Sequence, residues 1–521
     1  MSLEAAIATN RFGLGARPGE LRDAGADPRG WLRRQLTVAE LPPEIRRLPD
    51  SAHAFQQYDV AQQSRRQSRK SMDDDAPPTK ERDASPRNLV LPLYLDQVAA
   101  RYQVAQRTNR SFHERLVHFW TNHFAVSADK LTVLALAGTL ENEAIRPHLH
   151  GSFADLLLAV EAHPAMILYL DNQASIGPSS LVAQRVAKRA RQSERKLGIN
   201  ENLAREILEL HTLGVNGGYS QTDVTAFACA LTGWSVGSAR GPIAQGRPGT
   251  FEFRDNAHEP GSQVVLGKRY AEAGAEQPRA ILRDLAIHEA TATHIAAKLV
   301  RHFIADTPPP DAVARIATTF QETRGHLPSV HAALIELPDA WTREQRKLRT
   351  PHEFVVAALR MFDVIPQRPQ QILAPFQMLG QRPYTPGSPA GWPDVASQWD
   401  GPDALLSRIE WSTQVGARIG KTHSPVEAAD NALGELLTAR TRQAIARAES
   451  AAQGIALLLA SPEFQRRGHE SISKLLRSVF RPTGCPWARP CGARNPHLSP
   501  YKLRCPARLR TRTTVAHDVL R

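Results

Sequence analysis

The stretch NENLAREILELHTLGVNGGYSQTDVTAFACALTGW, residues 200–234, decides the fold class. Its first half places Leu203, Ile207 and Leu210 on one helix face, because side chains of an α-helix recur every 3.6 residues. Gly214 then supplies a residue that tolerates the positive φ at which helices end. The Asn-Gly-Gly loop that follows leads into a second apolar helix. A helix, its stop signal and the start of the next helix thus lie in one segment, which is typical of a helical protein.

The same kind of helix start recurs along the chain. A hydroxyl residue followed three positions later by a carboxylate can form a capping box, in which each side chain satisfies a free N–H group at the start of a helix. The pattern predicts helix starts at Ser152/Asp155, Ser220/Asp223, Thr350/Glu353 and Ser424/Glu427. The carboxylates of Asp223 and Glu353 are therefore assigned to helix capping rather than to catalysis.

Patterns typical of β-strands are sparse. Residues 250–254 and 262–267 flank a turn sequence, so they predict one small β-hairpin near 250–267. The predicted fold class is mostly α, with a large multi-helix domain and this one hairpin. The segments 88–240 and 270–467, on either side of the hairpin, suggest two helical lobes.

Composition places the chain among globular proteins. It has 521 residues, of which 42% are hydrophobic and 22% are charged. Residues 51–87 are rich in Gln, Ser, Arg and Asp and have little to bury, which predicts a disordered insert. The predicted organisation is an N-terminal helical segment (1–50), this insert, a helical body (88–467) and an atypical basic tail (468–521).

The net charge of +13 is concentrated near the C-terminus. Residues 471–521 hold eleven Lys and Arg residues and one acid, Asp518, so they carry +10 and leave +3 for residues 1–470. A nearly neutral body argues against nucleic-acid binding by the body. Three alternatives stand for the tail: a disordered basic arm that binds nucleic acid, a product of out-of-frame translation, or a zinc module. The spacing of Cys485, Cys491 and Cys505 matches no standard zinc motif.

The start of the chain gives no export or membrane signal. MSLEAAIATNRFGLGA lacks a basic segment followed by an apolar core, and no apolar run reaches the roughly 18 residues of a membrane span. Before the tail the only cysteine is Cys229, so no disulfide-forming compartment is required. These features predict a protein without a membrane span and, by default, a cytoplasmic location.

The helix near residue 206 carries residue types that bind cations. Glu206 and Glu209 lie on a polar stripe with Asn202, and His211 flanks the apolar face of the same helix. Carboxylates and imidazoles are ligands for hard or borderline divalent metals. Together with His123 from another helix, Glu206, Glu209 and His211 are therefore candidate metal ligands, and a metal-assisted hydrolase is one hypothesis for the function.

A structural interpretation uses the same residues. Glu201, Arg205 and Glu209 are spaced as helical ion pairs on a solvated face. His123 sits in an apolar stripe and is also interpreted as a core histidine with one hydrogen bond, as is His302. Asp171 follows an apolar helix and is a further polar candidate, because its turn could face the stripe of Asn202 and Glu206.

Known nucleotide-binding and catalytic motifs are missing from the sequence. Gly420-Lys421-Thr422 resembles the end of a P-loop, but Val415 stands where that motif requires glycine. His288-Glu289 begins like a zinc-protease motif, but Ala292 replaces the second histidine. The sequence therefore predicts no cofactor-binding loop.

Several segments together resemble a bacterial family, the domain of unknown function 1800 family, over roughly residues 5–467. In chain order these segments are NRFGLGARPGE (10–20), LVHFWTNHFAVS (116–127), HPAMILYLDN (163–172), the stretch 200–234 quoted above, HEPGSQVVLG (258–267), KLRTPHEFVVAALR (347–360), SPAGWPDV (388–395) and LASPEF (459–464).

The resemblance implies a partner protein. Members of this family are often encoded beside a second uncharacterised family, domain of unknown function 1501, which resembles alkaline-phosphatase-like proteins. The resemblance therefore implies a helical partner or scaffold protein that acts with this neighbour, and it implies no catalytic residue. Many relatives look exported. Three hypotheses for the function follow: a scaffold, a metal-assisted hydrolase with ligands from the 202–211 helix, or nucleic-acid binding through the tail.

Overall fold

Helices make up most of the chain that a computed structural model describes, which is residues 2–38, 40–70, 86–189, 198–238, 245–343, 347–365 and 368–467. These residues form 24 α-helices and two small antiparallel sheets, so the predicted mostly α fold is confirmed. None of the described helices is long and apolar enough to cross a membrane.

The α-helices of the first half of the chain are α1 (Leu3–Ile7), α2 (Glu20–Asp23), α3 (Pro28–Arg33), α4 (Pro43–Arg46), α5 (Ser51–Lys70), α6 (Pro86–Arg107), α7 (Ser111–His123), α8 (Ala137–Thr139), α9 (Phe153–Glu161), α10 (Pro164–Tyr169), α11 (Leu181–Arg189), α12 (Asn202–Glu206) and α13 (Gln221–Leu231). Those of the second half are α14 (Glu276–Ala286), α15 (Glu289–Phe303), α16 (Pro310–Glu322), α17 (Leu327–Ile335), α18 (Pro351–Met361), α19 (Pro369–Met378), α20 (Pro402–Ile419), α21 (Pro425–Leu433), α22 (Ala439–Ala446), α23 (Ala451–Ala460) and α24 (Pro462–Gln465). Three of these helices continue into π-helical turns, which are η1 (Ala8–Phe12), η4 (Leu140–Ile145) and η7 (Ile207–His211).

The predicted capping boxes begin the helices as expected. Before α18, the N–H of Glu353 donates to Thr350 Oγ1 over 3.4 Å, and the N–H of Thr350 donates to Glu353 Oε2 over 3.0 Å. Complete boxes of the same kind begin α9 and α13. At α21 the described residues form only one of the two bonds of the box, in which the N–H of Glu427 donates to Ser424 Oγ.

The strands pair differently from the predicted hairpin. Strand β1 (Trp234–Val236) pairs with β2 (Phe251–Phe253), and β3 (Gln263–Val265) pairs with β4 (Lys268–Tyr270). A small hairpin is therefore present, but residues 250–254 do not pair with residues 262–267.

A tight turn explains this pairing. Leu266 and Gly267, which join β3 to β4, both have positive φ, at 50° and 75°. Two consecutive residues with positive φ form the turn that matches the twist of adjacent antiparallel strands. Strand β3 therefore finds its partner immediately after the turn, and β2 is left to pair with the strand that follows α13.

Helix α5 corrects the prediction of a disordered insert. Residues 51–70 are helical, and Ala54, Phe55 and Ala61 are buried on the side of α5 that packs against α6. The apolar residues are few, but they recur at helical spacing, so a short stripe is enough to bury one face. The rest of the predicted insert, residues 71–85, and the basic tail from residue 468 lie outside the described residues.

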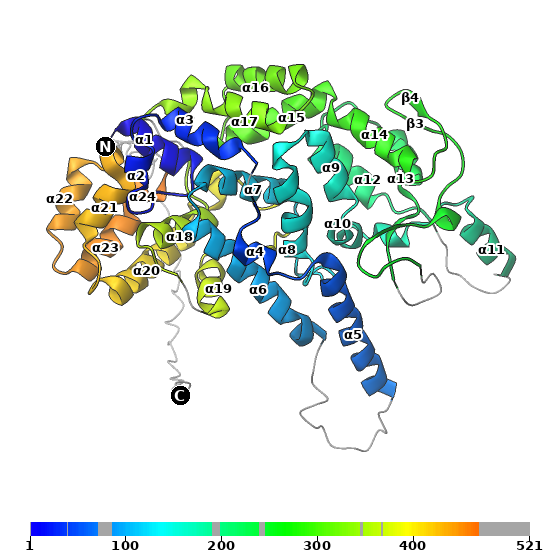
Figure 1. Ribbon diagram of the computed structural model, residues 1–521, viewed down its shortest axis with the longest axis horizontal. Coiled ribbons are helices and arrows are strands. Elements are labelled where there is room, and N and C mark those ends of the chain that lie inside the picture. The colour runs from blue at the N-terminus through cyan, green and yellow to red at the C-terminus, as the bar shows by residue number, and fades with distance from the viewer. Residues whose placement is uncertain are drawn as a thin grey trace, which may run out of the picture. The chain divides into compact units, whose positions relative to one another are not determined.

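The body is one unit rather than two lobes. Residues 1–470 cluster together, so the segments 88–240 and 270–467 are not separate. The two ends of the body are joined by polar contacts: Asn10 Nδ2 donates to the carbonyl of Ala432 over 2.8 Å, and Arg349 Nη2 donates to Asn10 Oδ1 over 2.7 Å. Figure 1 shows α1 and α2 beside α21.

Candidate functional site

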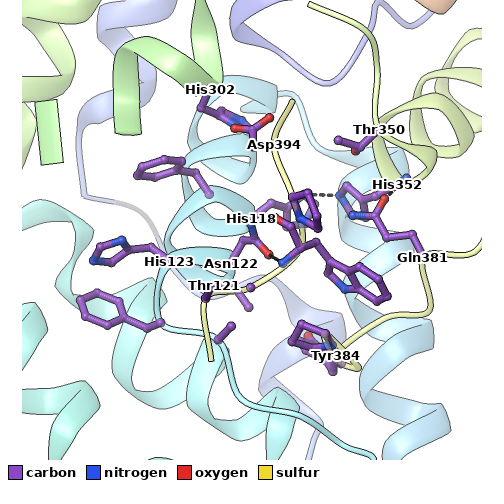
Figure 2. Close-up of a pocket in the computed structure, with 18 of the residues that line it drawn as sticks. His118, Thr121, Asn122, His123, His302, Thr350, His352, Gln381, Tyr384 and Asp394 are labelled. Atoms are coloured by element: carbon purple, nitrogen blue, oxygen red, sulfur yellow. Dashed lines mark hydrogen bonds and ion pairs between the residues drawn. The ribbon is translucent and has the colours of Figure 1, made fainter. Parts of the chain in front are cut away.

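A cavity of about 700 Å³ lies between α6, α7, α15, the start of α18 and the loop 381–395. Cavities of this size are typical of small-molecule sites. Its walls combine apolar side chains with histidine, lysine, arginine and aspartate side chains that come from segments far apart in the sequence. Figure 2 shows four of the histidines and Asp394 around the cavity.

His302 and Asp394 form a close pair at the cavity wall (Figure 2). His302 Nδ1 lies 2.7 Å from Asp394 Oδ2, and Arg115 Nε donates to His302 Nε2 over 3.2 Å. Both ring nitrogens are thus engaged. Burial lowers the pKa of His302 to about 4, so the ring is neutral at pH 7. His302 was expected to be a core histidine with one hydrogen bond, and it is instead a link between two charged side chains.

The loop that carries Asp394 is anchored on α7. Asn122 Nδ2 donates to the carbonyl of Trp392 over 2.9 Å, and the N–H of Trp392 donates to Asn122 Oδ1 over 2.8 Å. Gly391 has φ of 83°, and a Cβ atom there would lie 2.2 Å from the carbonyl oxygen of Asn122. The close approach and the positive φ both require glycine, so this residue fixes where Asp394 lies.

Lysine neutralises two of the acids in the wall. Lys347 Nζ lies 2.6 Å from Asp306 Oδ1 and 3.2 Å from Asp394 Oδ1. Burial alone would raise the pKa of Asp394, but the hydrogen bond from His302 and the charges of Lys347 and Arg467 hold it well below its usual range. Asp394 is therefore ionised, and both acids already have a cationic partner in Lys347.

The third acid, Glu353, is paired as well. Its Oε1 contacts the guanidinium groups of Arg115 and, at 2.9 Å, Arg467. Against the effect of burial, these two cations lower the pKa of Glu353 to about 2. The predicted capping role of Glu353 is confirmed by its Oε2, which accepts from the N–H of Thr350, while its other oxygen serves the cavity wall.

Helix α15 supplies two further cations of the cavity wall, Lys298 and Arg301. Lys298 lies four residues from His294 and from His302, and three residues from Arg301. All four side chains therefore share one side of this helix, and all four line the cavity. Within the described residues, neither Lys298 nor Arg301 forms an ion pair, although Arg301 Nε donates weakly to the carbonyl of Asp306. Burial lowers the pKa of Lys298 to about 8. The cavity therefore holds positive charge that the described carboxylates do not compensate.

A chain of hydrogen bonds leads from the cavity into the core. Tyr102 Oη lies 2.8 Å from His352 Nδ1, and His352 Nε2 lies 3.0 Å from His118 Nδ1, as the dashed line in Figure 2 marks. His118 Nε2 lies 3.3 Å from Glu114 Oε1, whose carboxylate is held by Arg146. Because Glu114 accepts, each histidine donates toward Glu114 and accepts on its cavity side, so Tyr102 donates at the outer end.

The predicted metal ligands from α12 and α7 are buried in separate roles. His211 and Glu161 are both fully buried, and His211 Nδ1 lies 2.8 Å from Glu161 Oε1. His123 Nε2 lies 3.2 Å from the carbonyl of His211, which is the single hydrogen bond expected of a core histidine. His123 also lines the cavity.

The acids of the same predicted set face elsewhere. Glu209 pairs with Arg205 at 3.7 Å, and burial raises the pKa of the half-buried Glu206. His211 lies at the end of the π-helical turn η7 and is fully buried, whereas Glu206 and Glu209 are half-buried. Across the part of the chain that the structure describes, no group of three or more His, Cys, Asp or Glu side chains is arranged to hold a metal ion.

Of the two other polar candidates, Asp171 forms an ion pair, and Asn202 is exposed and is held through its backbone. Asp171 Oδ2 pairs with Lys130 at 2.7 Å, and the N–H of the exposed Asn202 donates to Asn200 Oδ1 over 2.9 Å. The Glu201–Arg205 ion pair forms at 3.0 Å, as helical spacing predicts. The helix near residue 206 thus carries the ion pairs that the structural interpretation expects, and the metal-ligand hypothesis stays a prediction.

The residues that do line the cavity were mostly missed from the sequence. His294, Lys298 and His302 follow one another at intervals of four residues, which places them on one helix face. That spacing was a usable signal. Asp394 lies in a segment that was noted only for the family resemblance, and His352 lies in one that was noted for its capping pattern. No neighbouring residue in the sequence indicates the partners of either.

One family matches almost the whole described body. The family model for "Protein of unknown function (DUF1800)" matches residues 7–466. The chain belongs to the DUF1800 family. This confirms the resemblance, and every residue that lines the cavity lies within the DUF1800 match. A search of curated proteins and a search of solved structures each gave no significant match.

Proposed function

We propose that this protein binds a small anionic molecule, carrying a carboxylate or a phosphate, in the cavity beside α15. The observation that carries the proposal is that the acids of the cavity wall form ion pairs, whereas two of its cations do not. Asp306, Asp394 and Glu353 already have cationic partners, whereas Lys298 and Arg301 have no ion pair within the described residues.

Uncompensated cations in a concave site favour an anionic ligand. A half-buried ammonium or guanidinium group has given up part of its hydration, and a charge-assisted hydrogen bond to an anion restores it. Arginine adds a planar fork that matches carboxylate and phosphate oxygens. The apolar part of the wall, which includes Phe119 and Trp392, would cover the uncharged part of such a molecule.

Thermal unfolding with inorganic phosphate and with succinate tests the proposal. A ligand at 100 times its Kd stabilises the folded state by about 2.7 kcal/mol, so the unfolding temperature should rise with either anion. We expect Lys298→Gln and Arg301→Gln each to weaken this effect about tenfold in apparent Kd. Lys268→Gln is the matched control, because Lys268 is exposed on β4 and pairs with Asp284.

Two outcomes would contradict anion binding. One is an unfolding temperature that neither phosphate nor succinate raises. The other is an equal rise in wild type, Lys298→Gln and Arg301→Gln, which would place the anion elsewhere on the surface.

A second candidate function, a partner or scaffold role, is supported by exposed apolar side chains on α20. Leu405, Leu406 and Ile409 are 38%, 55% and 52% exposed and share one side of this helix. Exposed apolar side chains that gather on one element often mark a protein interface. The partner that the family resemblance implies is the neighbouring-encoded alkaline-phosphatase-like protein.

Co-purification tests the partner role. We expect the neighbouring-encoded protein to be retained by wild type and lost from Leu406→Lys/Ile409→Lys. Val264→Lys, which changes an exposed apolar residue on β3, is the control. Separation of the two wild-type proteins would reject the role.

Nucleic-acid binding through the tail stays a prediction. Retention on immobilised DNA, compared with and without residues 471–521, tests it.

A further inference from the structure

We infer that Lys298 is a nucleophile that forms an imine with small aldehyde or keto acids bound in the cavity. The inference rests on the proposed anion-binding function and adds a reaction to it. Its basis is the position of the Lys298 amine among cavity residues and the lack of a protein partner for it within the described chain.

The surroundings of Lys298 place its amine inside the cavity. After burial itself, the charge of Lys298 is the largest influence that lowers the pKa of both His123 and His294, so its ammonium group lies near both rings. The charge of Asp394 in turn acts on Lys298. All four residues line the cavity, yet Lys298 forms no hydrogen bond or ion pair with a described residue.

The same surroundings leave part of this amine uncharged. Burial is the main cause that lowers the pKa of Lys298 to about 8, Arg301 adds to the effect, and Asp394 opposes it. An ordinary lysine titrates near 10.4, so its free amine is scarce at neutral pH. A lysine desolvated beside another cation is the usual form of a nucleophilic lysine.

The chemistry balances without any further reactant. The amine of Lys298 adds to the carbonyl carbon, so a C–N bond forms and the C–O π bond breaks. A proton moves from nitrogen to oxygen, and loss of one water molecule leaves a C=N bond. Nothing is oxidised or reduced, so the cavity has to supply only the amine and a site for the carboxylate.

Arg301 is placed to hold that carboxylate. It lies three residues after Lys298 on α15, and side chains at this spacing are neighbours about 5–6 Å apart at Cβ. In a small aldehyde or keto acid the carboxylate is close to the carbonyl carbon. One molecule can therefore meet the guanidinium group of Arg301 and the amine of Lys298 together.

Reductive trapping of the full-length protein tests the inference. The protein is treated at pH 7.5 with glyoxylate and cyanoborohydride, which reduces the imine to a stable secondary amine, and the labelled lysines are located by peptide mass spectrometry. We expect Lys298 to be labelled at least about tenfold faster than Lys268, because a larger fraction of its amine is uncharged. Succinate should slow labelling of Lys298 and leave that of Lys268 unchanged.

Lys298→Arg separates the two proposals. It keeps a cation in the cavity, so stabilisation by phosphate should persist while labelling at position 298 disappears. Labelling of wild-type Lys298 no faster than Lys268, with phosphate or succinate still bound, would overturn the imine and leave anion binding standing. Neither labelling nor stabilisation by either anion would overturn both. Circular dichroism checks that Lys298→Arg is folded, and the wild-type comparison does not depend on it.

Discussion

His211 shows how a residue type suited to metal binding can serve the core. Its ring and the carboxylate of Glu161 are both fully buried and lie 2.8 Å apart. Each side chain is the polar partner of the other inside the core. Removing one partner of such a buried pair is strongly destabilising. The pair therefore supports the packing of α9 against the helix near residue 206.

We predict that His211→Ala lowers the free energy of unfolding by about 3 kcal/mol, because it leaves the carboxylate of Glu161 buried without this partner. Urea denaturation measures the change. The double variant His211→Ala/Glu161→Ala should lose less than the sum of the two single variants, because it removes both members of the pair.

Metal content of the same samples tests the sequence-based hypothesis directly. Since Glu206, Glu209, His211 and His123 are not arranged as one ligand set, elemental mass spectrometry should give equal metal content for wild type and His211→Ala. Stoichiometric metal in folded wild type that is lost from the variant would restore a metal site at this helix end.

Residue roles were predictable where their partners are local. The capping function of Asp223 and Glu353 follows from residues three positions away, and the structure confirms both capping boxes. The role of His302 was not predictable, because its partners Asp394 and Arg115 lie far from it in sequence. Helical periodicity can show that residues share a face, but it cannot show which distant segment that face meets.

At the scale of elements, the loop 388–395 depends on one glycine. Gly391 meets the backbone of Asn122 at a distance that leaves no room for a side chain. Gly387, four residues earlier, has no atom within 4 Å of the position of a Cβ. The two glycines therefore form a matched pair for mutation.

We predict that Gly391→Ala destabilises the protein by about 2 kcal/mol, through backbone strain and the contact with Asn122. It should also weaken stabilisation by phosphate, because the loop carries Asp394 and Trp392 into the cavity wall. Gly387→Ala should change neither quantity by more than about 0.5 kcal/mol. Thermal unfolding with and without phosphate measures both effects, and equal behaviour of the two variants would contradict the anchoring role of Gly391.

Elements were predicted best where a start signal and periodicity agree. The helices α9, α13 and α18 meet both conditions. Helix α5 was missed because its composition is polar, and its stripe of Ala54, Phe55 and Ala61 is narrow. The partners of β2 and β3 were missed because strand pairing is set by the turn at Leu266 and Gly267 rather than by apolar patterning.

At the scale of the whole molecule, buried neutral histidines make stability depend on pH. Burial lowers the pKa of His113 and His331 to about 3, and that of His294 and His302 to about 4. In the unfolded chain these rings titrate near 6.5. The unfolded state therefore binds more protons below that pH, so stability is complete above about 6.5 and is lost as the pH falls toward 4.

We predict a steep loss of stability between pH 6.5 and 4.5, with each such histidine contributing up to about 1.4 kcal/mol per pH unit. Urea denaturation across this range measures the slope. His331→Leu should reduce the slope, whereas His53→Leu, at an exposed position on α5, should not. A free energy of unfolding that is constant from pH 6.5 to 5 would contradict the prediction.

Arg467 is synthesised after every residue that lines the cavity, and it contacts one of them, Glu353. Until it docks, Glu353 lacks one of its two cations, and the backbone N–H of Arg467 has not yet bonded the carbonyl of Lys347. A ribosome releases α7 and α15 long before this residue, so in a nascent chain Glu353 is still without its second cation. We expect a chain that terminates before Arg467 to hold the Glu353 side of the proposed anion site less firmly than the full chain does.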